Sequence, residues 1–233
     1  MKKLIMAIDL DDKNKIYDLI DKIGDRIDIY KIGWIPYLIC GKEIIRRLKR
    51  ENKKVFIDFK FFDIPNTVKN VIRILCNYEI DMFTFHLLSG ERVCKSIGEL
   101  KKELKSDIKA IGVSVLTSFT NEDIKSLGFD IKIKKLVEKL AQIGYNCGID
   151  GVVCSGEELQ ILRKRFPPPF LIIVPGIRME KKDDQKRIIS VKEAIRNGAD
   201  FIVIGRPIYE SSDPVRTVEM ILKEIEDERQ NMD

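Results

Sequence analysis

Short apolar segments alternate with longer amphipathic segments along the whole chain. The apolar segments are rich in Ile, Val and Phe, as buried strands are, and the amphipathic segments repeat apolar residues with a helical period. Strands are predicted at residues 4–8, 27–32, 55–59, 82–85, 108–115, 151–153, 170–174 and 201–204. Helices are predicted at residues 11–23, 42–50, 66–76, 91–104, 131–143, 157–165, 191–197 and 214–228, with a short helical turn at 121–126.

Eight predicted strands, each followed by a helix, indicate an α/β protein with a (β/α)8 barrel fold. No shift in composition marks a domain boundary, and the prolines at 167–169 lie in a short connection, so we expect a single domain over residues 1–233. The alternative is a doubly wound open sheet, which usually has a glycine-rich turn after its first strand. Here Asp9-Leu10-Asp11-Asp12 follows that strand, which does not suit a phosphate-binding turn.

Polar residues gather where the predicted strands end. Active sites of such barrels lie at the carboxyl ends of the strands, so these residues are expected to share one mouth of the barrel. In chain order they are Asp9, Lys31, Asp58, Lys60, Thr84, His86, Thr117, Ser155, the Pro175–Arg178 segment, Gly205 and Arg206.

The segment from Val55 to Thr67 starts as an apolar strand and then places Asp58, Lys60 and Asp63 before a predicted helix. Residues two apart on a strand share a face, so Asp58 and Lys60 should point the same way as Phe56. One interpretation is a solvated strand end with Asp63 as a helix cap. The other is a functional charge cluster, and the gathering of polar residues at the other strand ends favours it.

The last two strands carry a possible phosphate site. Gly176 allows close approach of the backbone to a ligand, and Gly205-Arg206 follows the last strand, where barrels commonly hold phosphate. Arg206 can bind two phosphate oxygens at once. The polar segment 178–186 is either a solvated insertion or a lid over this site, and the spacing favours a lid.

Charge and cysteine content narrow the possible functions. Lys and Arg exceed Asp and Glu by 42 to 37 and are interspersed with them, which suits a small anionic substrate better than nucleic acid. The five cysteines form no CxxC pair, so neither a disulfide framework nor a zinc site is expected. The apolar run at 4–8 is too short for a signal peptide, and no run is long enough to cross a membrane. We therefore expect a cytoplasmic protein.

The chain resembles the orotidine 5′-phosphate decarboxylase family, which catalyses the last step of UMP synthesis. The central motif is Asp58-Phe-Lys60-Phe-Phe-Asp63-Ile-Pro-Asn-Thr67. Further matches in family order are Ala7-Ile8-Asp9, Tyr30-Lys31-Ile32-Gly33, Val115-Leu116-Thr117-Ser118, Val174-Pro-Gly-Ile-Arg178 with Asp184-Gln185, and Val203-Ile-Gly-Arg206. Two departures occur: Phe62 stands where histidine is common, and Leu87-Leu88 follow His86 where small residues are usual.

The resemblance implies decarboxylation of orotidine 5′-monophosphate to UMP and CO2 by a homodimer, without metal or cofactor. It implies that Lys60 protonates C6 of the pyrimidine, within a charge network completed by Asp58, Lys31 and Asp63. Asp63 and Thr67 would reach the partner subunit's site. The remaining substrate-binding residues it implies are Asp9 and Lys31 at the ribose, Thr117 and Ser118 at the pyrimidine, Gln185, Gly205 and Arg206 at the phosphate, Pro175 and Gly176 beside it, and Arg178 at the lid hinge.

Three alternatives stay open at the level of sequence. A sugar-phosphate decarboxylase or aldolase of the same barrel superfamily would need Mg²⁺ and an additional carboxylate where this chain has Lys31. A catalytically inactive phosphate-binding barrel is a second possibility, although the intact set of charged residues argues against it. A nucleic-acid-binding protein is disfavoured because no basic stripe or group of stacking aromatics is present. For His86, the only histidine, we favour a structural hydrogen bond over acid–base catalysis.

Overall fold

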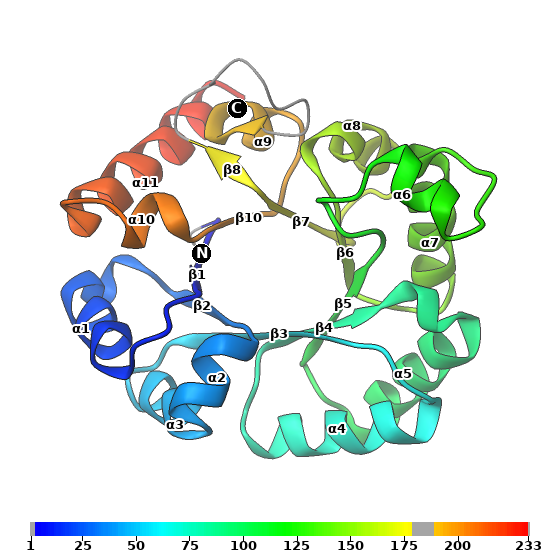
Figure 1. Cartoon of the computed structure of the whole chain (residues 1–233), viewed down its shortest axis with the longest axis horizontal. Coiled ribbons are helices and arrows are strands. Elements are labelled where there is room, and N and C mark those ends of the chain that lie inside the picture. The colour runs from blue at the N-terminus through cyan, green and yellow to red at the C-terminus, as the bar shows by residue number, and fades with distance from the viewer. Residues whose placement is uncertain (1–2, 179–188, 233) are drawn as a thin grey trace.

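The computed structural model describes residues 3–178 and 189–232. In this part of the chain, eight parallel strands close into a barrel in the order β1-β10-β7-β6-β5-β4-β3-β2, with helices outside the ring (Figure 1). The barrel strands are β1 (Leu4–Ile8), β2 (Ile29–Ile32), β3 (Lys54–Phe61), β4 (Met82–His86), β5 (Lys109–Val113), β6 (Gly151–Val153), β7 (Leu171–Pro175) and β10 (Phe201–Ile204). The predicted barrel is confirmed. An open sheet is excluded because β1 pairs with both β2 and β10.

The helices surround the ring in chain order. They are α1 (Lys13–Ile23), α2 (Trp34–Cys40), α3 (Glu43–Arg50), α4 (Pro65–Asn77), α5 (Glu91–Leu104), α6 (Asn121–Ser126), α7 (Ile133–Asn146), α8 (Gly156–Arg165), α9 (Val191–Arg196), α10 (Arg206–Tyr209) and α11 (Pro214–Gln230). Short 3-10 turns η1 (Gly24–Arg26) and η2 (Leu87–Ser89) follow α1 and β4, and β8 (Ile177–Arg178) pairs with β9 (Ile189–Ser190).

Several boundaries differ from the sequence predictions. β2 begins at Ile29 instead of residue 27, β5 ends at Val113 instead of residue 115, and β3 continues to Phe61. Helices α2 and α10 and the small β8–β9 sheet were not predicted. A surface helix is recognised in a sequence by polar residues on its exposed face. The exposed face of α2 carries the apolar residues Trp34 and Leu38 instead, so its sequence shows no such pattern.

Alternation along the strands divides the core into two layers. One set of side chains fills the barrel interior: Ile5, Ala7, Ile29, Phe56, Met82, Ile111, Ile173, Phe201 and Val203. The alternate residues, such as Leu4, Met6 and Ile8 of β1, pack outward against the helices. The interior layer ends below the polar strand ends, so it forms the apolar floor of whatever site lies at that mouth.

Three aspartates link neighbouring strands by hydrogen bonds at the amino-terminal ends of the strands. Asp81, Asp150 and Asp200 each directly precede a strand, and each accepts a hydrogen bond from the backbone N–H of a residue in a neighbouring strand. The N–H donors are Val55 at 2.8 Å, Ala110 at 2.8 Å and Ile172 at 2.7 Å, respectively. Each carboxylate also pairs with a cation from an outer helix: Lys49, Lys101 and Arg163, respectively.

Strand β3 is bulged near its carboxyl end. Ile57 pairs with Phe83 and Phe61 pairs with Phe85, so Asp58, Phe59 and Lys60 lie opposite the single residue Thr84 of β4. A bulge of this kind bends a strand and re-aims its side chains. Here it occupies the segment in which the sequence places its charges.

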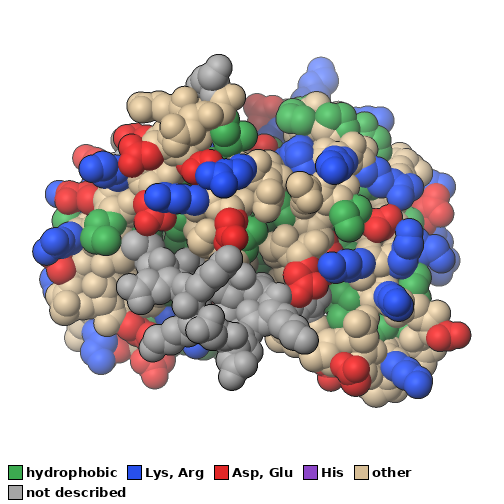
Figure 2. All heavy atoms as spheres, turned by 90° about the horizontal axis from the view of Figure 1, so that it is seen from above, with side chains coloured by type: hydrophobic (Ala, Val, Ile, Leu, Met, Phe, Trp, Pro, Cys, Tyr) green, Lys and Arg blue, Asp and Glu red, His purple; other side chains and the backbone are tan. Residues whose placement is uncertain are grey.

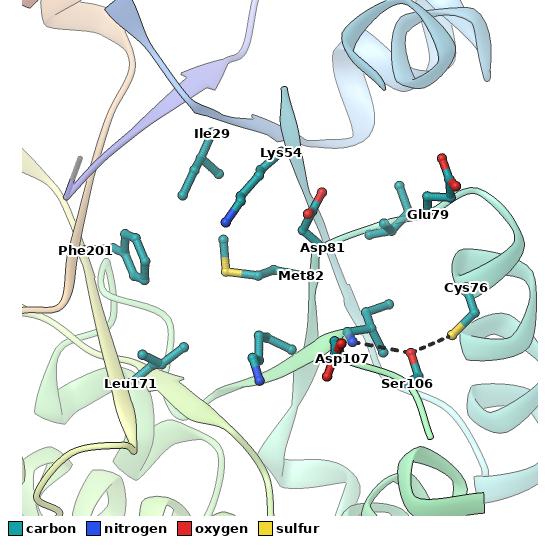
Figure 3. Close-up of a pocket in the computed structure, with 13 residues that line it drawn as sticks. Ile29, Lys54, Cys76, Glu79, Asp81, Met82, Ser106, Asp107, Leu171 and Phe201 are labelled. Carbon is teal, nitrogen blue, oxygen red and sulfur yellow. Dashed lines mark hydrogen bonds between the residues drawn. The ribbon is translucent and has the colours of Figure 1, made fainter. Parts of the chain in front are cut away.

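A cavity of about 580 Å³ lies at the amino-terminal mouth of the barrel (Figure 3). Ile29, Met82, Leu171 and Phe201, which are the first residues of their strands, point into it. Its rim mixes basic residues such as Lys54 with acidic ones such as Asp81. Because this cavity lies at the opposite end of the strands from Asp58 and Lys60, it is separate from the candidate active site.

Charged side chains are interspersed over the face of the molecule seen in Figure 2, where Lys and Arg lie among Asp and Glu. None of the described helices is long and apolar enough to cross a membrane.

Candidate active site

Asp58 is the centre of a charge cluster at the carboxyl-terminal mouth of the barrel. Its Oδ1 lies 3.0 Å from Nζ of Lys60, and its Oδ2 lies 3.2 Å from Nζ of Lys31 on β2. Lys31 also lies 3.4 Å from Oδ1 of Asp9, at the end of β1. Four predicted site residues from three adjacent strand ends therefore form one chain of alternating charge.

Burial differs along this chain. The side chains of Asp58 and Lys31 are 12% exposed, whereas that of Lys60 is 40% exposed. Desolvation opposes ionisation of Asp58, but Lys31, Lys60 and the hydroxyl of Thr84 outweigh it and keep the pKa of that carboxyl below its usual value. Asp58 is thus a carboxylate, and Lys60 is the cation of the cluster with most access to the mouth.

The backbone of Lys60 is in the left-handed region, with φ of 48°. For a residue with a side chain this conformation costs about 1–3 kcal/mol and is found mostly at functional sites. It allows the side chains of Asp58 and Lys60 to meet despite the bulge between them. The expectation that both charges point the same way therefore agrees with the geometry.

Asp63 and Thr67 lie outside this cluster in one subunit. Both are exposed, and Oδ1 of Asp63 accepts a hydrogen bond from the backbone N–H of Ile64 at 2.7 Å. Helix α4 begins at Pro65, and Ile64 is the N-cap residue without a side-chain cap, so the helix-cap interpretation of Asp63 is wrong. Across the described residues, Asp63 forms no ion pair with Lys60.

The predicted phosphate residues lie at the ends of two neighbouring strands. β7 and β10 are paired through Pro175 and Val203, which brings Gly176 and Gly205 to the same edge. A Cβ on Gly205 would lie 3.2 Å from Cβ of Ala7 and 3.3 Å from its carbonyl oxygen, so a side chain there would crowd β1. Arg206 is the exposed first residue of α10.

The structure describes only part of the predicted lid but both predicted pyrimidine-binding residues. The backbone of Arg178 pairs with Ser190 in the small sheet, while its side chain, Gln185 and most of the predicted lid at 178–186 lie outside the described residues. Thr117 is half-buried and Ser118 exposed in the connection between β5 and α6.

Two polar strand ends have structural explanations. The hydroxyl of Ser155 caps α8 in a reciprocal pair with Glu158. His86 accepts a hydrogen bond on Nδ1 from the N–H of Leu88 at 3.4 Å, and its ring lies 5.6 Å from that of Phe62. Burial, and then the charge of Lys60, hold the pKa of His86 below its usual value, which favours the neutral ring. The geometry agrees with the structural role predicted for this histidine.

Two features of the site were not predicted from the sequence. Thr84 was expected at this mouth, but its hydrogen bonds to Asp58 and Lys60 were not, and the bulge in β3 makes them possible. Gly33 leaves room for the cluster, since a Cβ on it would lie 3.2 Å from Oδ1 of Asp9 and 3.7 Å from Nζ of Lys31. Residue periodicity assumes regular strands, so it contained no signal for the contact at Thr84.

The sequence of this chain matches one known protein family over most of its length. Residues 2–221 match the model of the "Orotidine 5'-phosphate decarboxylase / HUMPS family". The chain is 40% identical over 228 residues to the orotidine 5′-phosphate decarboxylase of Wolbachia pipientis subsp. Culex pipiens, covering 97% of this chain and 100% of that protein. It is 38% identical to the enzyme of the same name from Dictyoglomus thermophilum, covering 96% of this chain and 95% of the relative.

Two solved structures superpose on almost the whole chain. A crystal structure of orotidine 5′-phosphate decarboxylase from Lactobacillus acidophilus superposes with a TM-score of 0.85 at 31% identity, covering 97% of this chain and 99% of that one. An uncharacterised conserved protein from Geobacillus kaustophilus superposes with a TM-score of 0.83 at 26% identity, covering 95% and 99% of the two chains.

Proposed function

The chain belongs to the orotidine 5′-phosphate decarboxylase / HUMPS family, and from that premise we propose that it decarboxylates orotidine 5′-monophosphate to UMP and CO2. The observation that carries the proposal is the alternating cluster of Asp9, Lys31, Asp58 and Lys60 at the carboxyl-terminal mouth of the barrel. We infer that the reaction uses these residues without a metal or cofactor.

The chemistry requires a fixed cation beside the reacting carbon. Loss of CO2 from C6 leaves a carbanion that no ring carbonyl is placed to delocalise. An ammonium group held at that carbon stabilises the charge as it develops and then supplies the proton. Lys60 suits both roles, because Asp58 holds its Nζ at 3.0 Å and its side chain is open to the mouth.

Asp58 has a second proposed role beside the substrate carboxylate. Two like charges about 4 Å apart repel by roughly 4 kcal/mol at an effective dielectric constant near 20. Contacts between the phosphate and Gly205, Arg206 and Gln185 would supply binding energy that holds the substrate against this repulsion. Asp9 and Lys31 would bind the ribose hydroxyls, and Thr117 and Ser118 the pyrimidine.

We also propose that the active unit is a homodimer in which Asp63 and Thr67 enter the partner's site. The support is that the segment bearing them presents apolar side chains to solvent, with Phe62 67% and Ile64 66% exposed. Trp34 of the neighbouring α2 is 53% exposed and stacks on Phe59 at 4.2 Å. Apolar surface of this kind beside a mouth is typical of an interface.

The nearest rival is a Mg²⁺-dependent sugar-phosphate decarboxylase or aldolase of the same barrel superfamily. Metal binding at Asp58 would have to compete with two ammonium groups, since Lys31 and Lys60 each contact one of its carboxylate oxygens. Among the described residues, no group of three or more His, Cys, Asp or Glu side chains is placed to hold a metal ion. The charge cluster therefore favours the decarboxylase.

The test is a spectrophotometric assay of orotidylate loss with purified protein, with and without a chelator. We expect UMP and CO2 to form at the same rate in both samples. Orotidylate loss that disappears on chelation and returns with Mg²⁺ would refute the metal-free reaction. Absence of any orotidylate loss would refute the decarboxylase and leave both the sugar-phosphate enzyme and an inactive phosphate-binding barrel.

A further inference from the structure

Thr84 hydrogen-bonds to two residues of the charge cluster, Asp58 and Lys60. Its Oγ1 donates a hydrogen bond to Oδ1 of Asp58 at 2.9 Å and accepts one from the backbone N–H of Lys60, also at 2.9 Å. The residue is completely buried in β4. One hydroxyl therefore uses both its donor and its acceptor capacity on the segment that carries Asp58 and Lys60.

The bulge explains why a hydroxyl is needed at this position. Asp58, Phe59 and Lys60 lie opposite Thr84 alone, so the regular ladder between β3 and β4 is interrupted there. The backbone N–H of Lys60 bonds to the Thr84 side chain in place of a strand carbonyl. This bond helps hold Lys60 in its left-handed conformation, from which its side chain reaches Asp58.

The bond to Asp58 also selects one carboxylate oxygen. Oδ1 receives both the Thr84 hydroxyl and the Lys60 ammonium group, while Oδ2 faces Lys31. Rotation of the carboxylate would exchange these partners. A fixed donor on a buried strand opposes that rotation, and so keeps Nζ of Lys60 at a fixed place in the mouth.

We propose that Thr84 is a positioning residue for the reaction, holding the carboxylate of Asp58 and the backbone of Lys60 so that the Lys60 ammonium group is aimed at the reacting carbon. The inference deepens the proposed decarboxylation and rests on it for its kinetic consequences. Its structural consequence, a fixed and ionised Asp58, holds without substrate.

The kinetic test compares Thr84→Val, which keeps the shape and removes the hydroxyl, with Thr84→Ser, which keeps the hydroxyl. We expect Thr84→Val to lower kcat about 10- to 100-fold, with KM within about threefold of the wild type, because a hydrogen bond to a charged group is lost. Thr84→Ser should restore most of kcat. Ser96→Ala is the matched control, because it removes another buried hydroxyl, which bonds Val93 O at 2.8 Å outside the barrel.

The second readout is the titration of Asp58, followed by carbon NMR of labelled aspartate without substrate. The groups around Asp58 are Lys31 and, through it, Asp9, together with Lys60 and Thr84. His86 is close enough to Lys60 for the charge of the lysine to help lower the pKa of the histidine. Lys31, Lys60 and Thr84 outweigh the effect of burial and hold the pKa of Asp58 below its usual value, so ionised Asp58 stabilises the fold at higher pH and the contribution is lost as the pH falls through the lowered pKa. Thr84→Val removes a donor to the carboxylate, so the Asp58 titration should move to higher pH.

The outcomes distinguish the positioning role of Thr84 from the proposed decarboxylase function. Wild-type kcat with an unshifted Asp58 titration in Thr84→Val, or a Thr84→Ser variant as impaired as Thr84→Val, would overturn the positioning role. A wild-type protein without decarboxylase activity would refute the proposed function alone, and the NMR shift would still decide whether Thr84 holds Asp58. Thr84→Ala serves the same comparison if Thr84→Val does not fold.

Discussion

The charged residues in the mouth of the barrel differ in their exposure to solvent. Lys60 is the cation with most access to the mouth, while Asp58 and Lys31 are largely buried. Burying charges is costly unless they are paired, and here each buried charge lies within 3.4 Å of an opposite one. The two exposed ends of the cluster, Asp9 and Lys60, are therefore the parts available to a substrate.

Lys60→Ala should remove both the developing-charge stabilisation and the proton donor. We expect turnover to fall by at least about 10⁴-fold, because both effects depend on one ammonium group. Binding of UMP, measured by calorimetry, should stay within about tenfold of the wild type, because phosphate contacts lie elsewhere.

Lys54→Ala is the control for this variant, since Lys54 begins the same strand at the opposite mouth. It should keep wild-type activity. A Lys60→Ala enzyme that still decarboxylates orotidylate would refute the proton-donor assignment.

At the scale of elements, the sequence was informative where the strands are regular. Alternating and continuous apolar runs located the barrel strands, and the polar residues at or just after their carboxyl ends identified Asp9, Lys31, Asp58 and Lys60. The bulge in β3 could not be predicted, because it depends on which β4 residues pair with Ile57 and Phe61. Helix α2 was missed for a related reason, since its exposed Trp34 and Leu38 hide the helical pattern.

We expect the aspartates that precede β4, β6 and β10 to stabilise the barrel. Asp150 accepts a hydrogen bond from Ala110 N at 2.8 Å and pairs with Lys101 and Lys109 at the mouth opposite the active site. Asp150→Ala leaves these donors without their acceptor, so we expect a loss of about 1–3 kcal/mol in the free energy of unfolding.

Urea denaturation of Asp150→Ala measures this loss, and kcat should be unchanged. The exposed Asp107, at the same mouth, provides the control Asp107→Ala, which should change stability by less than about 0.5 kcal/mol. Equal stability of the two variants would show that Asp150 does not fasten β5 to β6.

At the scale of the whole molecule, the proposed site needs residues from two subunits. Asp63 and Thr67 are exposed and apart from the cluster in one chain, beside apolar side chains that are also exposed. A single chain therefore presents an incomplete version of the charge network that the family resemblance implies.

Mixing two inactive variants tests the shared site. A heterodimer of Lys60→Ala and Asp63→Asn chains has one site with both native residues and one with neither. Statistical pairing at equal concentrations should therefore restore about a quarter of wild-type activity.

Differently tagged chains, co-expressed and purified through both tags, ensure that heterodimers are assayed. Their activity should be about half that of the wild type per dimer. Heterodimers as inactive as the parents would place Asp63 and Lys60 in the same subunit's site.

The closure of the ring between β1 and β10 has a consequence for synthesis of the chain. β10 is the last barrel strand to be made, and it pairs with β1 on one side and β7 on the other. Until residues 201–204 leave the ribosome, the growing sheet has two unpaired edges made of apolar strands. Such edges readily pair with other chains. The nascent protein is therefore most exposed to aggregation in the interval just before its final strand and helix are added.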